Sequence, residues 1–253
     1  MNFGPCNAGA PPPLHLKFEE KETKRQLSGR SMRMKTEVKI PAGQAALDGS
    51  FIAPEGATTI VLFVHGSGSS RHSPRNQFVA RTLNRAGLAT LLFDLLTAEE
   101  EAVDVHTAEY RFDISMLAGR LLEVTKWTLE QKASLRIGYF GSSTGAGAAL
   151  VAAAERPRDI AAVVSRGGRP DLAGDALTQV RAPTLLVVGG SDPAVIELNE
   201  QTRQLMRCEV KLEIIPHATH LFEEPGALEQ VAQLAIDWFV SRVDQSPYGI
   251  PAI

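Results

Sequence analysis

Short, continuous apolar runs recur along the chain, and such runs are typical of parallel strands that are covered on both faces. We expect strands at 59–64, 89–93, 137–140, 160–164 and 184–188. Residues 210–215 (VKLEII) instead alternate between apolar and polar positions, which predicts an edge strand with one wet face.

Two further strand-like segments, 36–41 and 48–53, are joined by a short turn and predict an antiparallel start to the same sheet. Helical patterns fall between the apolar runs. Within 110–131 the apolar residues recur at spacings of three and four, and a similar stripe leads to Trp238 near the end of the chain. This alternation predicts an α/β fold, with a mostly parallel sheet and helices on both faces.

The length of 253 residues and the hydrophobic content of 44% fit one large domain, which we place at 36–243. Residues 1–35 contain Pro11 to Pro13 and then a charged stretch without an apolar period, which predicts a flexible N-terminal leader. Residues 244–253 are interpreted as a C-terminal tail.

A formal net charge of -3 argues against nucleic acid or an acidic membrane surface as a partner. No apolar run approaches the roughly 18 residues that a membrane-spanning helix needs, and the N-terminus does not resemble a secretory signal. The two cysteines, Cys6 and Cys208, do not form a disulfide framework. We therefore expect a cytoplasmic protein; the sequence leaves its oligomeric state open.

The first candidate for chemistry is the segment Gly141-Ser142-Ser143-Thr144-Gly145, which lies between a predicted strand and a helix of small residues. A sharp strand-to-helix turn can present a serine at the top of a sheet, and it strains the central residue. Glycines two residues before and after that serine relieve the crowding. The segment thus predicts Ser143 as a nucleophile; the alternative is an ordinary glycine-rich helix entry.

A serine hydroxyl needs a base, and His220 is the best candidate because it follows the strand at 210–215. Asp192, at the end of the segment TLLVVGGSDP, is the candidate acid that orients this base. The chain order serine, acid, histidine is the one expected for α/β-hydrolases. His217 competes with His220, and the lesser candidate acids are Asp171 and Glu223. Asp192 followed by proline is also a good helix N-cap.

An oxyanion intermediate would be stabilised by two backbone N–H groups. One would come from Thr144, directly after the nucleophile. The other would come from the loop VHGSGSS, where we assign it to Ser67. His65 in the same loop is interpreted as a residue that braces the loop rather than as a catalytic group.

These stretches together make the chain resemble the α/β-hydrolase superfamily and, within it, the dienelactone hydrolases. The matching segments are LFVHGSGSSRHSPRN, LLFDLLT, IGYFGSSTGAGAAL, VVSRGGRPDLA, LLVVGGSDPAVIELN and ATHLFEEPGALE. The resemblance covers about residues 36–243 and implies an eight-stranded sheet and hydrolysis through an acyl-enzyme, with no metal or other cofactor. Relatives with these segments also occur fused to phosphoribosyltransferase-like domains, and no such domain is expected here.

One departure from the family concerns the nucleophile, because dienelactone hydrolases proper carry cysteine where this chain has Ser143. The resemblance therefore indicates the reaction class better than the substrate. Only about 20 residues separate the strands at 160–164 and 184–188, which leaves no room for a large lid. A small, soluble ester or lactone bound in an open cleft is the expected substrate.

Four arginines, Arg71, Arg75, Arg166 and Arg169, lie in loops that follow predicted parallel strands. Ligands bind at this edge of such sheets, so two or more of these arginines could hold an anionic substrate group. The alternative, which we favour, is ordinary pairing with Asp94, Asp171 or the acidic run 99–101.

Two other classes of function stay open. The glycines at 141, 145 and 147 resemble the nucleotide-binding turn of short-chain dehydrogenases, and Arg166 could meet the 2′-phosphate of NADP. That turn belongs near a chain start, however, and no tyrosine here has a lysine four residues later. A protein with the hydrolase fold could also bind a ligand or partner without catalysis.

Overall fold

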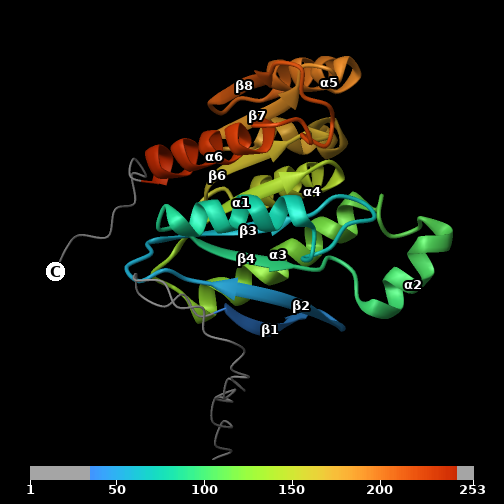
Figure 1. Cartoon of the computed structure of the whole chain (residues 1–253). Coiled ribbons are helices and arrows are strands. Elements are labelled where there is room, and N and C mark those ends of the chain that lie inside the picture. Colours follow the sequence, from blue (N-terminus) through green and yellow to red (C-terminus); the bar gives the residue numbers. More distant parts are fainter. Residues whose placement is uncertain (1–34, 244–253) are drawn as a thin grey trace, which may run out of the picture.

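The computed structural model describes residues 35–243, so the expected leader (apart from Lys35) and the tail at 244–253 lie outside the described part. Eight strands form one sheet in the order β1-β2-β4-β3-β5-β6-β7-β8 (Figure 1). The strands are β1 (Lys35–Ala42), β2 (Ala45–Ile52), β3 (Thr59–Val64), β4 (Ala89–Phe93), β5 (Arg136–Ser142), β6 (Ile160–Arg166), β7 (Thr184–Gly189) and β8 (Val210–Ile215).

The sheet is mostly parallel, as predicted. The hairpin β1–β2 and the pair β2–β4 are antiparallel, whereas every other pairing, from β4 through β3, β5, β6 and β7 to β8, is parallel. β8 lies at the edge, in agreement with its alternating sequence. The carboxyl ends of the parallel strands therefore share one edge of the sheet, where ligands bind in folds of this kind.

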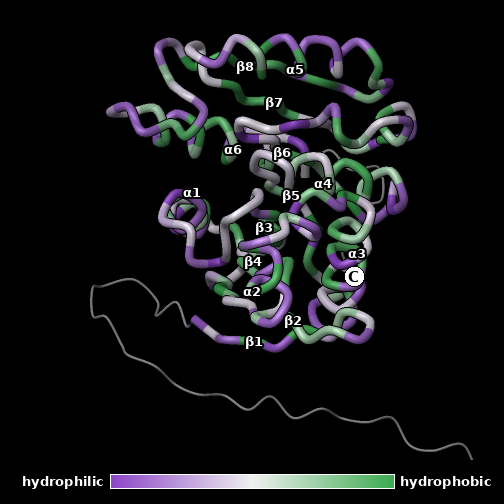
Figure 2. Tube along the Cα trace, turned by 90° about the vertical axis from the view of Figure 1, so that its right-hand side faces the viewer, coloured by the Kyte–Doolittle hydropathy of each residue, from purple (hydrophilic) through white to green (hydrophobic). Residues whose placement is uncertain are grey.

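Helices cover both faces of the sheet (Figure 2). One face carries α1 (Pro74–Arg85) and α6 (Ala227–Val243), and the other carries α3 (Ile114–Gln131) and α4 (Thr144–Glu155). A 3₁₀ segment, η1 (Pro170–Gln179), packs between α4 and α5 (Pro193–Leu205). The chain between β6 and β7 is thus a packed part of the domain, as the short spacing there predicted, and not a lid.

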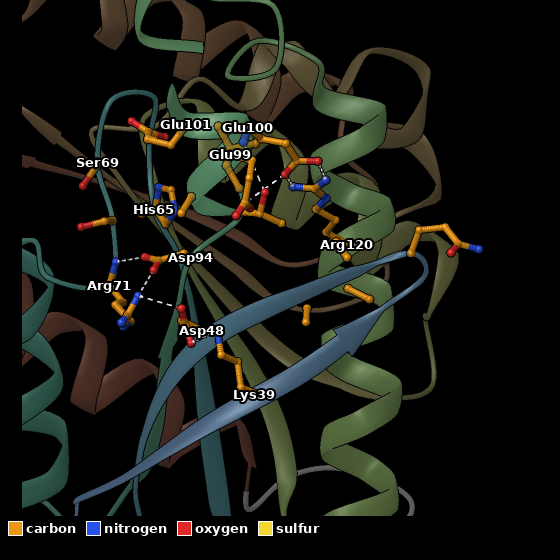
Figure 3. Close-up of a pocket in the computed structure, with 18 of the residues that line it drawn as sticks. Lys39, Asp48, His65, Ser69, Arg71, Asp94, Glu99, Glu100, Glu101 and Arg120 are labelled. Atoms are coloured by element: carbon orange, nitrogen blue, oxygen red, sulfur yellow. Dashed lines mark hydrogen bonds and ion pairs between the residues drawn. The ribbon is translucent and has the colours of Figure 1, made fainter. Parts of the chain in front are cut away.

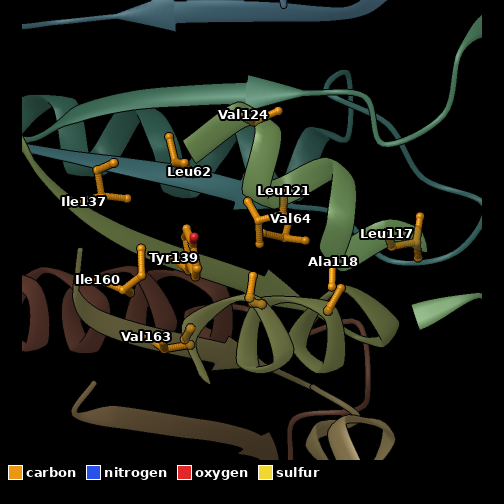
Figure 4. Packing of buried hydrophobic residues seen from close by; sticks show 14 of the residues in the cluster. Leu62, Val64, Leu117, Ala118, Leu121, Val124, Ile137, Tyr139, Ile160 and Val163 are labelled. Carbon is orange, nitrogen blue, oxygen red and sulfur yellow. The ribbon is translucent and has the colours of Figure 1, made fainter. Parts of the chain in front are cut away.

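The buried residues form two clusters that correspond to the two faces. In the cluster on the α3–α4 face, Leu62 and Tyr139 of the sheet meet Leu121 of α3 (Figure 4). The Tyr139 hydroxyl shares a hydrogen bond of 2.7 Å with Thr125 Oγ1, which satisfies both buried groups. The small residues of α4 serve the same packing, because a Cβ on Gly147 would lie 2.9 Å from Leu172 Cβ in η1.

Helix α2 (Ala98–Thr107) is an element that the hydrophobic pattern did not predict. It projects from the body of the domain (Figure 1), and its apolar residues are exposed, with Val105 62% accessible. Local contacts hold it instead. Thr97 and Glu100 form a capping box at its start, and Arg120 Nη1 of α3 donates to Glu100 Oε2 at 2.6 Å. Within residues 35–243, no helix has the length and apolar character needed to cross a membrane.

Candidate active site

Ser143 occupies the sharp turn between β5 and α4, with φ 51° and ψ -125°. A residue with a side chain rarely adopts a positive φ, so the surrounding structure must impose this conformation. Three backbone bonds do so. The N–H of Ser143 donates to the Arg166 carbonyl at 3.3 Å, and its own carbonyl accepts from Arg169 at 3.0 Å and from Ala146 at 3.1 Å. Ser143 is half-buried, whereas Ser142 is only 3% exposed.

Glycines make this turn possible. A Cβ on Gly141 would lie 2.6 Å from Ala146 Cα, and a Cβ on Gly145 would collide with the Val64 carbonyl oxygen. The crowding at Gly145 therefore comes mainly from the end of β3 and not, as expected, from Gly141. A third glycine matters as well, because a Cβ on Gly66 would lie 2.9 Å from the Cβ of Ser143. The loop after β3 thus approaches the serine closely.

His220 and Asp192 meet at the same edge of the sheet. His220 Nδ1 lies 2.7 Å from Asp192 Oδ2, although 28 residues separate them in the chain. Asp192 stands at the N-cap position of α5, but its side chain makes no capping bond, so its carboxylate is engaged by the histidine instead. The lesser candidate acids are paired elsewhere: Asp171 accepts from Arg169, and Glu223 accepts from Arg75.

His220 lies close to the end of β6, the strand that pairs with β5 next to Ser143. Gly167 follows Arg166, whose carbonyl accepts the Ser143 N–H, and Gly167 has φ 49°. A Cβ on Gly167 would lie 3.0 Å from the His220 carbonyl oxygen and 3.6 Å from its ring carbon Cε1. The absence of a side chain at Gly167 therefore lets the His220 loop pack against the end of β6.

The two expected oxyanion donors have different surroundings. Thr144 is the first residue of α4, so its N–H has no acceptor within its own helix and can point to a ligand. The Ser67 N–H already donates to the Thr144 side-chain oxygen at 2.9 Å. Nothing in the sequence indicates this bond, which ties the loop after β3 to the start of α4. In this structure the Ser67 N–H is therefore engaged and not free for an oxyanion, in contrast to its expected role.

His65 braces that loop from the other side. Its Nε2 accepts the Leu95 N–H at 3.0 Å, so Nδ1 carries the proton and donates to the Gly66 carbonyl at 2.9 Å. Burial lowers the pKa of His65 and keeps the ring neutral. This arrangement matches the interpretation of His65 as a bracing residue.

The four candidate arginines are not equivalent. Arg71 pairs with Asp94, whose carboxylate also accepts the Arg71 N–H at 2.7 Å. Arg169 forms two bonds of 2.8 Å with Asp171, and Arg75 pairs with Glu223 at 3.2 Å. Pairing of this ordinary kind was the alternative to a substrate clamp. Arg166 differs, because it is only 8% exposed and its Nε and Nη1 make no hydrogen bond with any described residue.

A cavity of about 920 Å³ opens beside this region, between the β1–β2 hairpin, the loop after β3 and the start of α2 (Figure 3). Arg71, Asp94 and Arg120 line it together with other charged residues, whereas Ser143, Asp192 and His220 do not. The charged groups of this cavity are largely paired with one another, as in Lys39–Asp48, Arg71–Asp94 and Arg120–Glu100. In the described range 35–243, no group of three or more His, Cys, Asp or Glu side chains could hold a metal ion.

Comparison with known proteins gives a consistent picture of the fold. The model of the dienelactone hydrolase family matches residues 48–240. A solved dienelactone hydrolase from Anabaena variabilis is 57% identical with a TM-score of 0.82, over 83% of this chain and 98% of that one. Est1E from Butyrivibrio proteoclasticus has the same fold, with 17% identity, a TM-score of 0.69, and coverage of 83% of this chain and 99% of that one.

A Mycobacterium tuberculosis protein that is named as a phosphoribosyl transferase is 56% identical over 209 residues. The match covers 82% of this chain but only 46% of the relative, so this chain spans about half the length of the curated relatives it matches.

Proposed function

Because the chain belongs to the dienelactone hydrolase family, we propose that it is a serine hydrolase that cleaves a small, soluble carboxylic ester or lactone. Ser143 is the nucleophile, His220 the general base and Asp192 the acid that orients the base. The observation that carries this proposal is the 2.7 Å contact between His220 and Asp192, at the same sheet edge as the strained Ser143.

The contact determines which nitrogen of His220 can act as a base. Asp192 accepts the proton on Nδ1, so the lone pair is on Nε2. Nε2 takes the proton of the Ser143 hydroxyl as the oxygen attacks the substrate carbonyl. The resulting oxyanion is stabilised by the N–H of Thr144, whereas the Ser67 N–H positions the loop after β3 through its bond to Thr144 Oγ1.

The tetrahedral intermediate collapses when the bond to the alcohol breaks, and His220 gives its proton to the leaving oxygen. This step leaves an acyl group on Ser143. A water molecule then repeats the sequence, with His220 as the base, and releases the carboxylic acid. A small substrate is favoured because the chain between β6 and β7 is packed as η1 and provides no lid.

The name of the M. tuberculosis relative suggests a second reaction, phosphoribosyl transfer. That name describes a protein of which this chain covers only 46%. Nothing in the Ser143 region specifically favours phosphoribosyl transfer. The residues that this chain shares with the relative's matched part support hydrolysis instead. They include the strained turn at Ser143 and the His220–Asp192 pair.

Labelling with a fluorophosphonate, followed by mass-spectrometric mapping, tests the proposal directly. We expect one modified residue, Ser143, and no label in Ser143→Ala. The matched control is Ser142→Ala, which should retain labelling and most hydrolysis of p-nitrophenyl acetate because the Ser142 side chain is buried. Label on Ser142 would contradict our assignment of the nucleophile, and a folded protein that neither labels nor hydrolyses esters would favour a non-catalytic binding function.

A further inference from the structure

Asn199 is a fully buried polar side chain in the middle of α5, two helical turns after Asp192. The buried residues of this helix, Val195, Asn199 and Thr202, follow one another at spacings of four and three, so they form one face that packs against the domain. A polar side chain on such a face loses its hydrogen bonds with water and needs partners within the protein.

The Asn199 side chain finds those partners through its nitrogen. Its Nδ2 donates to the Gly168 carbonyl at 3.1 Å and to the Val195 carbonyl at 2.8 Å. Because both neighbours are acceptors, they fix the orientation of the side-chain amide. The buried Oδ1 makes no hydrogen bond with any described residue. An apolar side chain of similar shape would avoid this unpaired oxygen, so the donor is the part of Asn199 that has a use.

The bond to Gly168 leads to Ser143 through a single peptide unit. The Gly168 carbonyl and the Arg169 N–H belong to the same planar group and point in opposite directions. The carbonyl accepts from Asn199, and the N–H donates to the Ser143 carbonyl at 3.0 Å. A rotation of this peptide would break both bonds, and hydrogen bonds in series strengthen one another. Two hydrogen bonds thus link Asn199 to the backbone of Ser143.

This peptide needs an external hold because two glycines precede its N–H. Gly167 and Gly168 lack the Cβ that restricts backbone rotation in other residues. A stiffer residue cannot replace Gly168, because its Cβ would collide with Ser165 Oγ. The φ of 51° at Ser143 has to be imposed by neighbouring groups, and the Gly168–Arg169 peptide is one of them.

We propose that Asn199 is a positioning residue for the nucleophile, because it fixes the peptide that holds Ser143 in its strained conformation. This inference rests on the proposed function, in which Ser143 attacks the substrate. The same helix begins at Asp192, whose Oδ2 lies 2.7 Å from His220 Nδ1. Helix α5 therefore positions the acid at its start and the nucleophile turn from its middle.

The kinetics of fluorophosphonate labelling separate binding from chemistry at Ser143. Asn199→Leu removes the donor with little change in side-chain volume. We expect the rate constant kinact to fall by about 10- to 100-fold, because a small displacement of the nucleophile is costly. The constant KI for the encounter complex should change by less than about threefold. The kcat/KM for p-nitrophenyl acetate should fall with kinact.

Asn199→Ser provides a second variant that keeps part of the local bonding. Its hydroxyl can bond to the Val195 carbonyl four residues back in the helix, but it is too short to reach Gly168. We therefore expect it to fold and to lose kinact by a factor similar to that of Asn199→Leu. Wild-type kinact in Asn199→Ser would show that the bond to Gly168 does not position Ser143 and would overturn the proposal.

Two controls distinguish positioning from a loss of stability. Thr202→Val changes the next buried residue on the same face of α5, and Val124→Ala removes buried methyl groups from α3. Val124→Ala should lower the melting temperature, and both controls should keep kinact within about twofold of the wild type. If Val124→Ala lost as much kinact as the Asn199 variants, lower stability would explain the effect and the proposal would be wrong.

Nuclear magnetic resonance tests the linkage without a substrate. In Asn199→Ser the Arg169 N–H should exchange at least about tenfold faster with solvent, whereas the amides of β3 should change no more than in Val124→Ala. The downfield signal of the proton on His220 Nδ1 should persist, because the contact with Asp192 is unchanged. Loss of that signal would mean that α5 itself has moved, which would contradict a specific effect on Ser143.

These measurements separate failure of this proposal from failure of the proposed function. If the wild type is labelled at Ser143 and the Asn199 variants match it in kinact and in Arg169 exchange, the positioning role fails and the hydrolase function stands. If the wild type neither labels nor hydrolyses esters, the hydrolase function fails. The catalytic role of Asn199 then fails with it, even where faster Arg169 exchange shows that Asn199 holds the turn.

Discussion

The backbone N–H of Ser67 donates to the Oγ1 of Thr144 at 2.9 Å, across 77 residues of sequence. Thr144 thus has two functions in the proposed site. Its N–H is a candidate oxyanion donor, and its hydroxyl accepts the Ser67 N–H and so holds the loop after β3. The loop after β3 is therefore positioned by the residue that follows the nucleophile.

Thr144→Val tests the importance of this bond, because valine keeps the shape of threonine and removes the hydroxyl. We expect a loss of about 1–3 kcal/mol in the free energy of unfolding, since the Ser67 N–H loses its partner. Ester hydrolysis should also fall, because the loop is no longer held in place. Urea unfolding and steady-state kinetics measure the two effects. Thr144→Ser, which retains the hydroxyl, should stay close to the wild type; an equal loss in both variants would contradict this explanation.

The glycines can be tested as a pair of substitutions with opposite effects. Gly145→Ala places a methyl group against the carbonyl of Val64 and should destabilise the domain by about 1–3 kcal/mol. Gly119→Ala lies on the exposed side of α3 with no atom within 4 Å of the new Cβ. It should stabilise the domain by about 0.5–1 kcal/mol, because alanine favours helix. Thermal melting distinguishes the two, and equal effects would show that local crowding is not the cause.

Asp192→Asn removes the charge that orients His220 with little change in shape. We expect kcat for ester hydrolysis to fall by about 10³- to 10⁴-fold, because the amide can hold the imidazole in the wrong tautomer. The melting temperature should change little. Asp171→Asn is the control, because Asp171 pairs with Arg169 and not with the histidine. If the Asp171 variant lost the activity and the Asp192 variant kept it, our assignment of the acid would be wrong.

The buried Asp104 predicts a pH dependence for the α2 region. Burial raises the pKa of this carboxyl, but N–H groups of Arg111 and Tyr110 and the Arg111 guanidinium outweigh burial and lower it below the ordinary value of 3.8. The ionised form is favoured in the folded state, so its contribution to stability is present above about pH 4 and is lost as pH falls through the lowered pKa.

Hydrogen exchange over residues 98–113 therefore should accelerate between pH 5 and about pH 2 more strongly than over the central strands, after correction for intrinsic exchange rates. In Asp104→Asn the segment should already exchange faster at pH 7, and its difference from the wild type should shrink as pH falls. A constant difference across this range would show that ionisation of Asp104 does not hold the segment.

The sequence alone determined the elements whose stability depends on burial. Each continuous apolar run became a parallel strand, because such a run can be buried only between two layers of helices. It also indicated the sharp turn at Ser143, since the glycines around it leave room for the close contacts that such a turn makes. Helix α2 could not be predicted in this way. Its residues bury little apolar surface, and the bonds of Glu100 with Arg120 and of Asp104 with Arg111 come from residues outside the helix.

Only the tertiary structure decided which charged groups meet. The sequence placed four arginines at one edge of the sheet but gave no means to tell the paired ones from the unpaired one. Arg71 pairs with Asp94, and Arg169 pairs with Asp171. Arg166 lies on β6 between β5 and β7, and its buried Nε and Nη1 make no hydrogen bond with any described residue. It likewise selected His220 over His217 as the partner of Asp192. Pairing depends on distances between side chains from separate strands and loops, and these distances exist only once the sheet has assembled.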